Sequence, residues 1–288
     1  MNIATQRLSS IMMLPELRAI FQHMMIHDTT KHGYRQRWST TIQEIQVALG
    51  ADSAAITPFV SSWELMYSAI SHLDHIQDRD IISDSVFLAL EDAQRYNVVF
   101  GYYVFAECVL SELTSLISAD RVLRLRTCWS EAMLRMASGQ YRDLLFTNAT
   151  SSASPHSYQE IAQAKTGATF ALGFGGAAML HTDDVQIISA LQFLGEIYGT
   201  LLQYSDDLLD SDAQQNATLT LPTIFEQAHP HMSQPTSKAA FWMFVYRSYY
   251  KHALGIAQTL PETIRNLMLG LFTQTFGAVQ IEESTYAV

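Results

Sequence analysis

Two acidic clusters interrupt apolar stretches of this 288-residue chain. Asp74 and Asp78 lie four residues apart, and so do Asp206 and Asp210, with Asp207 between them. On a helix, that spacing puts both carboxylates on one face, where uncompensated like charges repel. A divalent cation removes the repulsion, and Mg²⁺ typically combines one or two carboxylates with substrate phosphate. The spacing therefore predicts that these five aspartates form a magnesium-dependent phosphate site.

The elements that carry these clusters have the periodicity of helices. Apolar residues recur every three or four positions over Glu91–Ile117, Val122–Phe146 and Ile187–Leu209, and no long segment alternates with period two. Phe170–Leu180 is apolar on nearly all sides, so we expect that helix to be buried all round. No repeat or domain-separating linker is evident. The sequence predicts an all-α fold in which residues 1–288 form a single domain.

Composition excludes several classes of protein. With 28 acidic and 17 basic residues the formal charge is −11, which argues against a nucleic-acid partner because no basic stripe could neutralise phosphates. The uncharged apolar runs, such as Val98–Ala106, are shorter than the roughly 20 residues of a membrane span, so we expect a protein that does not span the membrane. Two cysteines and no signal-peptide pattern favour a cytoplasmic location.

Five motifs in order resemble those of the trans-isoprenyl diphosphate synthases, the all-α class I isoprenoid (terpene) synthases. The resemblance runs from about Lys31 to Phe225. The motifs are an acidic pair at Asp74 and Asp78, Gly139-Gln140-Tyr141-Arg142-Asp143, Lys165-Thr166-Gly167, Asp206-Asp207-Leu208-Leu209-Asp210 with the upstream Gln203, and Thr220-Leu221-Pro222.

The resemblance implies a helical bundle around a central apolar cavity. About three Mg²⁺ ions, held by the acidic clusters, would help to remove the diphosphate of an allylic prenyl diphosphate and leave a carbocation. It makes Asp74, Asp78, Asp206 and Asp210 the catalytic residues. The residues that would bind the substrate diphosphate are Lys165, Thr166, Gln203, Arg35 and Arg79. A homodimer is the expected assembly.

The sequence departs from the family where chain-elongating members bind isopentenyl diphosphate. Tyr34 and Tyr67 occupy positions where the family has a lysine and a histidine, and no Arg-Arg-Gly follows Asp78. The segment 211–219 also lacks the expected lysine. Each charge-assisted hydrogen bond to phosphate contributes about 1.5–3 kcal/mol, so these losses should weaken the acceptor site strongly. His75 stands where a second aspartate is expected.

We therefore expect a terpene synthase that ionises a prenyl diphosphate and quenches the cation by water capture or proton loss. There are three alternatives. The protein could transfer the prenyl group to a non-isoprenoid acceptor, elongate it to a polyprenyl diphosphate, or be a non-catalytic subunit. In the family, side chains about one turn before the first aspartate form the cavity floor. Here they are Ala69 and Ile70, and the lack of an aromatic ring at these positions favours a C20 substrate, linear or already cyclised.

Overall fold

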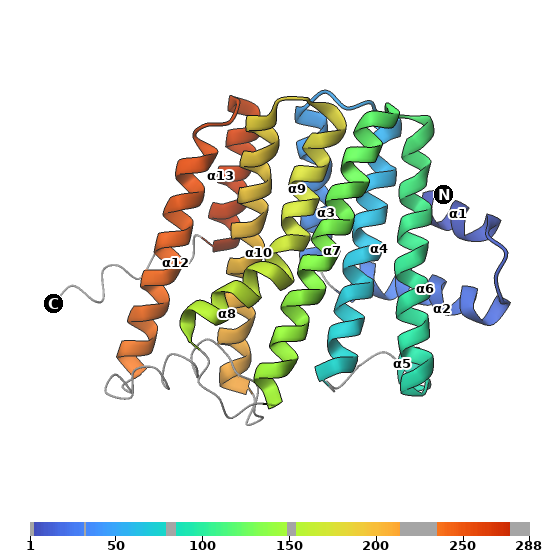
Figure 1. Ribbon diagram of the computed structural model, residues 1–288, viewed down its shortest axis with the longest axis horizontal. Coiled ribbons are helices and arrows are strands. Elements are labelled where there is room, and N and C mark those ends of the chain that lie inside the picture. The colour runs from blue at the N-terminus through green and yellow to red at the C-terminus, as the bar shows by residue number, and fades with distance from the viewer. Residues whose placement is uncertain (1–2, 32, 79–84, 149–153, 214–234, 277–288) are drawn as a thin grey trace. The chain divides into compact units, whose positions relative to one another are not determined.

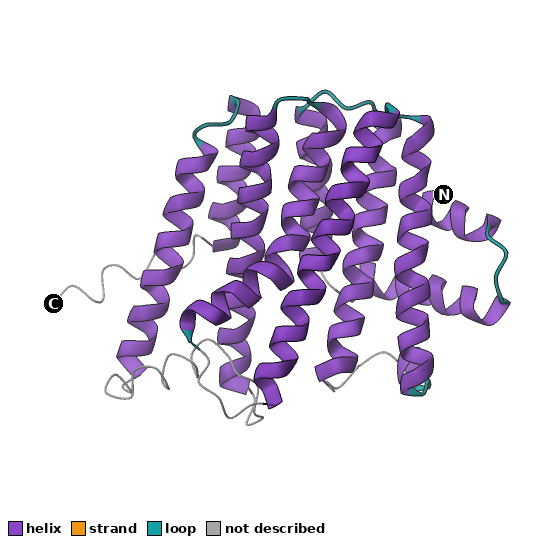
Figure 2. Ribbon diagram, viewed as in Figure 1, coloured by secondary structure: helices purple, strands orange, loops and turns teal. Residues whose placement is uncertain are grey.

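The computed structural model describes residues 3–31, 33–78, 85–148, 154–213 and 235–276, and within those ranges it describes no side chain for 27–37, 85, 146–148, 155, 207–213 or 235–244. The described residues form helices joined by short turns and contain no strand (Figure 2). The all-α prediction is confirmed. The chain divides into two compact units, Met1–Leu125 and Arg126–Val288. Whether the whole chain is a single domain stays a prediction.

The first unit is built around the packing of α4 on α6. Its elements are α1 (Ile3–Ser10), α2 (Pro15–Lys31), α3 (Gly33–Ala48), α4 (Ser53–Asp78), α5 (Ser85–Leu88), α6 (Asp92–Leu110), the 3₁₀ turn η1 (Ser111–Ser115) and the start of α7 (Ala119–Asn148) (Figure 1). The Ser62 hydroxyl on α4 donates to the Ala106 carbonyl on α6 at 2.6 Å. Phe21 of α2 packs edge-on against Tyr102 of α6, with ring centroids 5.1 Å apart.

Local sequence explains where α3 ends and α4 begins. Gly50 follows α3 with φ of +82°, a left-handed conformation that costs a glycine little, and the Ala51 amide donates back to the Gln46 carbonyl. Asp52 then accepts a hydrogen bond from the Ala54 amide at 3.1 Å, as an N-cap residue does. The turn at Gly50 ends α3, and the Asp52 cap fixes the start of α4. The first acidic cluster lies at the other end of α4.

The second unit contains the rest of α7 and, among the described residues, six further helical segments. They are α8 (Pro155–Ala162), the π-helix η2 (Gln163–Gly167), α9 (Ala168–His181), α10 (Val185–Ala213), α12 (Pro235–Ala257) and α13 (Glu262–Phe276). In α9 every residue from 168 to 178 is buried, as predicted. Tyr198 of α10 lies among four phenylalanine rings, with centroid distances of 5.1–5.8 Å, and these are Phe170, Phe174, Phe272 and Phe276.

Glycines let α10 approach its neighbours backbone to backbone. A Cβ atom at Gly195 would lie 2.3 Å from the Phe170 carbonyl oxygen, and one at Gly199 would lie 2.6 Å from the Thr166 carbonyl oxygen. Neither distance is possible for a real side chain, so both positions require glycine while the helices keep this spacing. Figure 1 shows α9 and α10 side by side along their length. The close packing holds η2 against the part of α10 that leads to the second acidic cluster.

Two apolar stretches, Asp92–Ser115 and Val185–Asp206, are long and apolar enough to cross a membrane by length and composition alone. The sequence-based expectation that no segment is long enough to span a membrane was therefore wrong, because it considered only runs without any charged residue. In the structure, 44% and 50% of these windows are buried. Val98, Phe105, Leu194 and Tyr198 are among their buried core residues. Burial of one face against other helices is the arrangement of core helices in a soluble fold.

Candidate active site

The first acidic cluster lies on the last two turns of α4. Asp74 and Asp78 are both half-buried, and the Asp74 Oδ1 atom is fully buried. Their four-residue spacing on a continuous helix puts both carboxylates on one face. His75 is exposed, in contrast to both aspartates. Two hard oxygen ligands in this arrangement suit Mg²⁺, with the remaining ligands supplied by phosphate and water. Arg79 lies outside the described residues.

One turn earlier, α4 is tightly packed. His72 is 8% exposed, and its Nδ1 lies 2.9 Å from the Ser68 carbonyl oxygen, a hydrogen bond that requires the proton on Nδ1. Its ring also packs on Phe87 at a centroid distance of 5.0 Å. Ala69 is 1% exposed and Ile70 is half-buried. Ala69 is thus a small, buried residue one turn before the first aspartate, and its role as the floor of a cavity stays a prediction.

An aromatic cluster occupies the middle of α4, and the sequence analysis missed it as a group. The half-buried Tyr67 stacks on Trp63 with centroids 5.3 Å apart and meets Trp38 of α3 edge-on at 5.2 Å. Beside it, the Glu64 carboxylate accepts a hydrogen bond from the Ser39 hydroxyl. Two indoles therefore pack against the residue that replaces the family's histidine. Arg35 and Tyr34 lie on α3, but their side chains are outside the described residues.

In the second unit, Lys165 lies on the π-helix and is 9% exposed. Its ammonium group is 2.8 Å from the Asp143 carboxylate on α7, the partner that a buried cation requires. The neighbouring Thr166 hydroxyl donates to the Gln203 Oε1 atom on α10 at 2.7 Å. The structure thus brings together three of the five residues predicted to bind diphosphate, namely Lys165, Thr166 and Gln203. It adds Asp143, a residue of the Gly139–Asp143 motif for which the sequence alone predicted no separate role.

The π-helix is the element that carries Lys165 and Thr166 to their partners Asp143 and Gln203. A π turn inserts one residue into a helix, and such turns are frequent at functional sites. At the same level, α7 comes so close that a Cβ atom at Gly139 would lie 2.7 Å from the Lys165 backbone nitrogen. Asp206 follows Gln203 on α10 by almost one turn, and its side chain is exposed. Asp207 and Asp210 belong to the same helix, but their side chains lie outside the described residues, as does the Thr220-Leu221-Pro222 motif.

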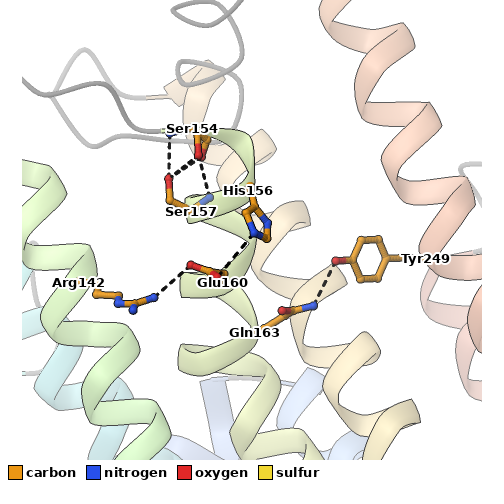
Figure 3. A network of polar contacts seen from close by, with 7 residues as sticks. All are labelled: Arg142, Ser154, His156, Ser157, Glu160, Gln163 and Tyr249. Carbon is orange, nitrogen blue, oxygen red and sulfur yellow. Dashed lines mark hydrogen bonds and ion pairs between the residues drawn. The ribbon is translucent and has the colours of Figure 1, made fainter.

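A polar network anchors the start of the π-helix (Figure 3). The Gln163 amide donates to the Tyr249 hydroxyl of α12 at 3.3 Å, and Glu160 pairs with Arg142 of α7 at 3.2 Å. Tyr249 also hydrogen-bonds the buried Tyr204, and burial raises the pKa of both phenols. Both hydroxyls therefore stay neutral at physiological pH and act as hydrogen-bonding groups. The sequence carries no short-range signal for this network, since its members come from five separate elements.

Among the described side chains, no group of three or more acidic, histidine or cysteine residues gathers closely enough to hold a metal ion. The second acidic cluster extends beyond those side chains, so its ligands stay predictions. In the first unit, the carboxylate oxygen atoms of Asp74 and Asp78 are hard ligands of the kind that Mg²⁺ prefers, and Asp206 offers the same kind of ligand in the second unit.

Comparison with known proteins identifies the family. Residues 19–219 match the polyprenyl synthetase family, so this chain belongs to that family. It is 25% identical over 207 residues to nonaprenyl diphosphate synthase of Mycobacterium tuberculosis, covering 70% of this chain and 59% of that protein. The matched part of this chain therefore spans about three fifths of that relative's length.

Solved structures share the fold. Geranylgeranyl pyrophosphate synthetase from the archaeon Geoglobus acetivorans superposes with a TM-score of 0.78 at 18% identity, over 93% of this chain and 95% of that one. Heptaprenyl diphosphate synthase from Staphylococcus aureus gives a TM-score of 0.75 at 17% identity, over 96% of each chain. The predicted fold and family are thereby confirmed, whereas the predicted loss of the isopentenyl diphosphate site is not tested.

Proposed function

We propose that this protein is a Mg²⁺-dependent class I terpene synthase that ionises a C20 prenyl diphosphate, linear or already cyclised, and converts the cation to a diterpene product. Membership of the polyprenyl synthetase family supports a prenyl diphosphate as the substrate. The observation that carries the proposal is the Trp38–Tyr67–Trp63 cluster with Glu64 beside it. The half-buried Tyr67 and Trp38 and the Glu64 carboxylate carry no positive charge that could bind a second diphosphate.

In this proposal the leaving diphosphate is held by Lys165, with Thr166 beside it. Asp143 keeps the Lys165 ammonium in place, and Gln203 fixes the Thr166 hydroxyl. Bound Mg²⁺ supplies the charge that stabilises the diphosphate as the carbon–oxygen bond breaks. Asp74, Asp78, Asp206, Asp207 and Asp210 would hold it. Arg35 and Arg79 are the remaining proposed contacts to the diphosphate.

Chain elongation is the second candidate, and the comparisons support it better than they support a terpene synthase. The relatives reported above are named for geranylgeranyl, heptaprenyl and nonaprenyl diphosphate synthesis. The aromatic cluster at Tyr67 argues for the terpene synthase, since aromatic rings attract cations rather than phosphates. Prenyl transfer to a non-isoprenoid acceptor is the third outcome to be tested.

One experiment separates these outcomes. The full chain is incubated with geranylgeranyl diphosphate and Mg²⁺, with and without isopentenyl diphosphate, and the products are identified by mass spectrometry. A terpene synthase releases diphosphate and a C20 alcohol or hydrocarbon in both reactions. Longer prenyl diphosphates in the second reaction would instead establish chain elongation. Lys165→Met serves as the matched control, because it has a similar length without the charge and should abolish diphosphate release.

We further propose that the protein is a cytoplasmic homodimer. Tyr96, Phe100 and Val104 recur at four-residue intervals on α6 with 44%, 67% and 42% exposure, which forms an apolar stripe along the helix. Such a stripe suits a second copy of the same helix. Both cysteines are free thiols, in keeping with a reducing compartment.

A further inference from the structure

Gln77 lies within the first acidic cluster, on the last turn of α4. Each residue advances an α-helix by about 100°, so the order around this end of the helix is Gln77, Asp74, Asp78 and His75. Gln77 is half-buried, whereas His75 at the other edge is exposed. Gln77 also follows Asp74 by three residues, a spacing at which side chains on a helix are neighbours. Its amide therefore borders the Asp74 carboxylate on the buried side of the cluster.

The Gln77 Oε1 atom is fully buried, and it has no hydrogen-bond partner among the described residues. The Asp74 Oδ1 atom is buried as well. An amide oxygen and an ionised carboxylate oxygen only accept hydrogen bonds, so these two atoms do not pair with each other. A buried acceptor without a partner destabilises a folded protein, and an apolar side chain at position 77 would avoid that cost. A glutamine here is accounted for by a ligand that interacts with its oxygen.

The neighbours of this oxygen indicate which kind of ligand that is. Because Oε1 only accepts, its partner must be a hydrogen-bond donor or a cation. A water molecule can donate to Oε1, but it leaves the repulsion between Asp74 and Asp78 uncompensated. A divalent cation interacts with the amide oxygen and also removes that repulsion. Amide carbonyl oxygens serve beside carboxylates as ligands of hard divalent cations.

We propose that the Gln77 amide oxygen is a ligand, together with Asp74 and Asp78, of a divalent cation at the end of α4. This inference rests on the proposed function, which assigns Mg²⁺ to the same two aspartates. His75 stands where a second aspartate is expected, so Gln77 adds an oxygen to a cluster with one carboxylate fewer. A neutral ligand attracts a cation less than a carboxylate does. Gln77→Glu should therefore tighten metal binding, an effect that a purely structural amide does not predict.

The test measures metal binding without substrate, so it does not depend on activity. The full chain is titrated with Mn²⁺, and free Mn²⁺ is determined from its electron paramagnetic resonance signal. Mn²⁺ is the probe because it takes the same carboxylate and carbonyl ligands as Mg²⁺. The variant Asp74→Asn shows which part of the binding belongs to the first acidic cluster.

Wild type is compared with Gln77→Met, which removes the oxygen, and with Gln77→Glu, which adds a charge. Gln46→Met is the control for loss of a buried amide. Gln46 is 0% exposed, and its amide donates to the Ile42 and Ile56 carbonyls, both at 3.5 Å. His75→Glu is the control for charge alone, because it adds the same carboxylate at the exposed edge of the cluster.

We expect Gln77→Met to raise the dissociation constant of Mn²⁺ about tenfold and Gln77→Glu to lower it about tenfold. Gln46→Met should leave it unchanged, and His75→Glu should lower it less than Gln77→Glu does. The inference is overturned if wild type binds no Mn²⁺ at this cluster or if Gln77→Met binds as tightly as wild type. It is also overturned if Gln77→Glu binds no more tightly than wild type or than His75→Glu.

Diphosphate release from geranylgeranyl diphosphate tests the proposed function separately. If wild type releases no diphosphate while the Mn²⁺ affinities follow the expected order, the proposed function fails and the ligand role of Gln77 stands. If diphosphate is released but the affinities do not follow that order, only the role of Gln77 is wrong.

Thermal unfolding separates the loss of a ligand from damage to the helix. Without metal, Gln77→Met should unfold at or above the wild-type temperature, because it removes the buried Oε1 atom. Gln46→Met should unfold at a lower temperature, because it removes an amide that is hydrogen-bonded. Mn²⁺ should raise the unfolding temperature of wild type more than that of Gln77→Met, since tighter binding to the folded chain stabilises it more. If metal-free Gln77→Met is destabilised as much as Gln46→Met, the amide is a structural group and the inference is wrong.

Discussion

The contact between α7 and the π-helix leads to a sharp prediction for Gly139→Ala. The added Cβ atom would lie 2.7 Å from the Lys165 backbone nitrogen and 2.9 Å from the Ala164 Cβ atom. Neither neighbour is the free end of a flexible side chain, so the two helices must separate. Overpacking of this kind costs about 1–3 kcal/mol, and replacing a helical glycine by alanine returns about 0.5–1 kcal/mol. We expect a net destabilisation of about 1–2 kcal/mol.

That free energy corresponds to a measurable shift in unfolding temperature. At about 2–4 °C per kcal/mol for domains of this size, Gly139→Ala should unfold about 2–8 °C below wild type by differential scanning calorimetry. Gly255→Ala is the matched control, since Gly255 lies in helix α12, is exposed and has no atom within 4 Å of the added Cβ. That control should unfold at or slightly above the wild-type temperature.

The same substitution should affect activity, because it displaces the backbone of Lys165 relative to Asp143. A loss of about 1.4 kcal/mol of transition-state stabilisation lowers the rate tenfold, so we expect diphosphate release to fall by about that factor. If Gly139→Ala is as stable as Gly255→Ala and equally active, α7 and the π-helix are not in close contact. In that case the position of Lys165 would not depend on the approach of α7.

Three further predictions concern the metal, the cavity and the assembly. Asp206→Asn should abolish diphosphate release at any Mg²⁺ concentration, and full wild-type activity in excess chelator would exclude a metal-dependent reaction. Ala69→Phe should shift substrate preference from C20 toward C15, measured as relative kcat/KM in protein whose helix content is unchanged by circular dichroism. Unaltered C20 turnover in that variant would mean that the floor lies elsewhere. If the proposed dimer forms through the α6 stripe, Phe100→Asp should lower the mass measured by light scattering from that of two chains to that of one, and an unchanged mass would exclude the stripe as the interface.

The sequence predicted those features that depend on local pattern. Helical periodicity and sparse glycine and proline were enough to predict an all-α fold, and α9 is buried as its composition indicated. Motif order was enough to predict the family, as the match over residues 19–219 confirms. The pairing of Thr166 with Gln203 joins two residues that were both predicted to bind diphosphate.

Features that depend on packing between distant elements were not predictable. Asp143 is 22 residues from Lys165, and only the approach of α7 to the π-helix shows that they pair. Tyr67 was interpreted only as the loss of a cationic side chain. Its stacking on Trp63 and its edge-on contact with Trp38 are seen only in the structure, and the second contact requires α3 to pack on α4. The absence of a hydrogen-bond partner for the Gln77 Oε1 atom among the described residues is likewise a property of the folded environment, since every glutamine looks alike in a sequence.

The π turn at Gln163–Gly167 also has a consequence for the evolution of this site. The helical run from Pro155 to His181 is continuous through this turn. A single added residue in such a run rotates everything after it by about 100°, because each residue of an α-helix turns by that angle. Deleting one residue, for example Ala164, would turn the π turn into regular α-helix. Tyr158 before the turn and Phe170 after it would then no longer point in their present directions relative to each other. Insertions and deletions are therefore more damaging here than substitutions, although the segment has the length and composition of an ordinary helix.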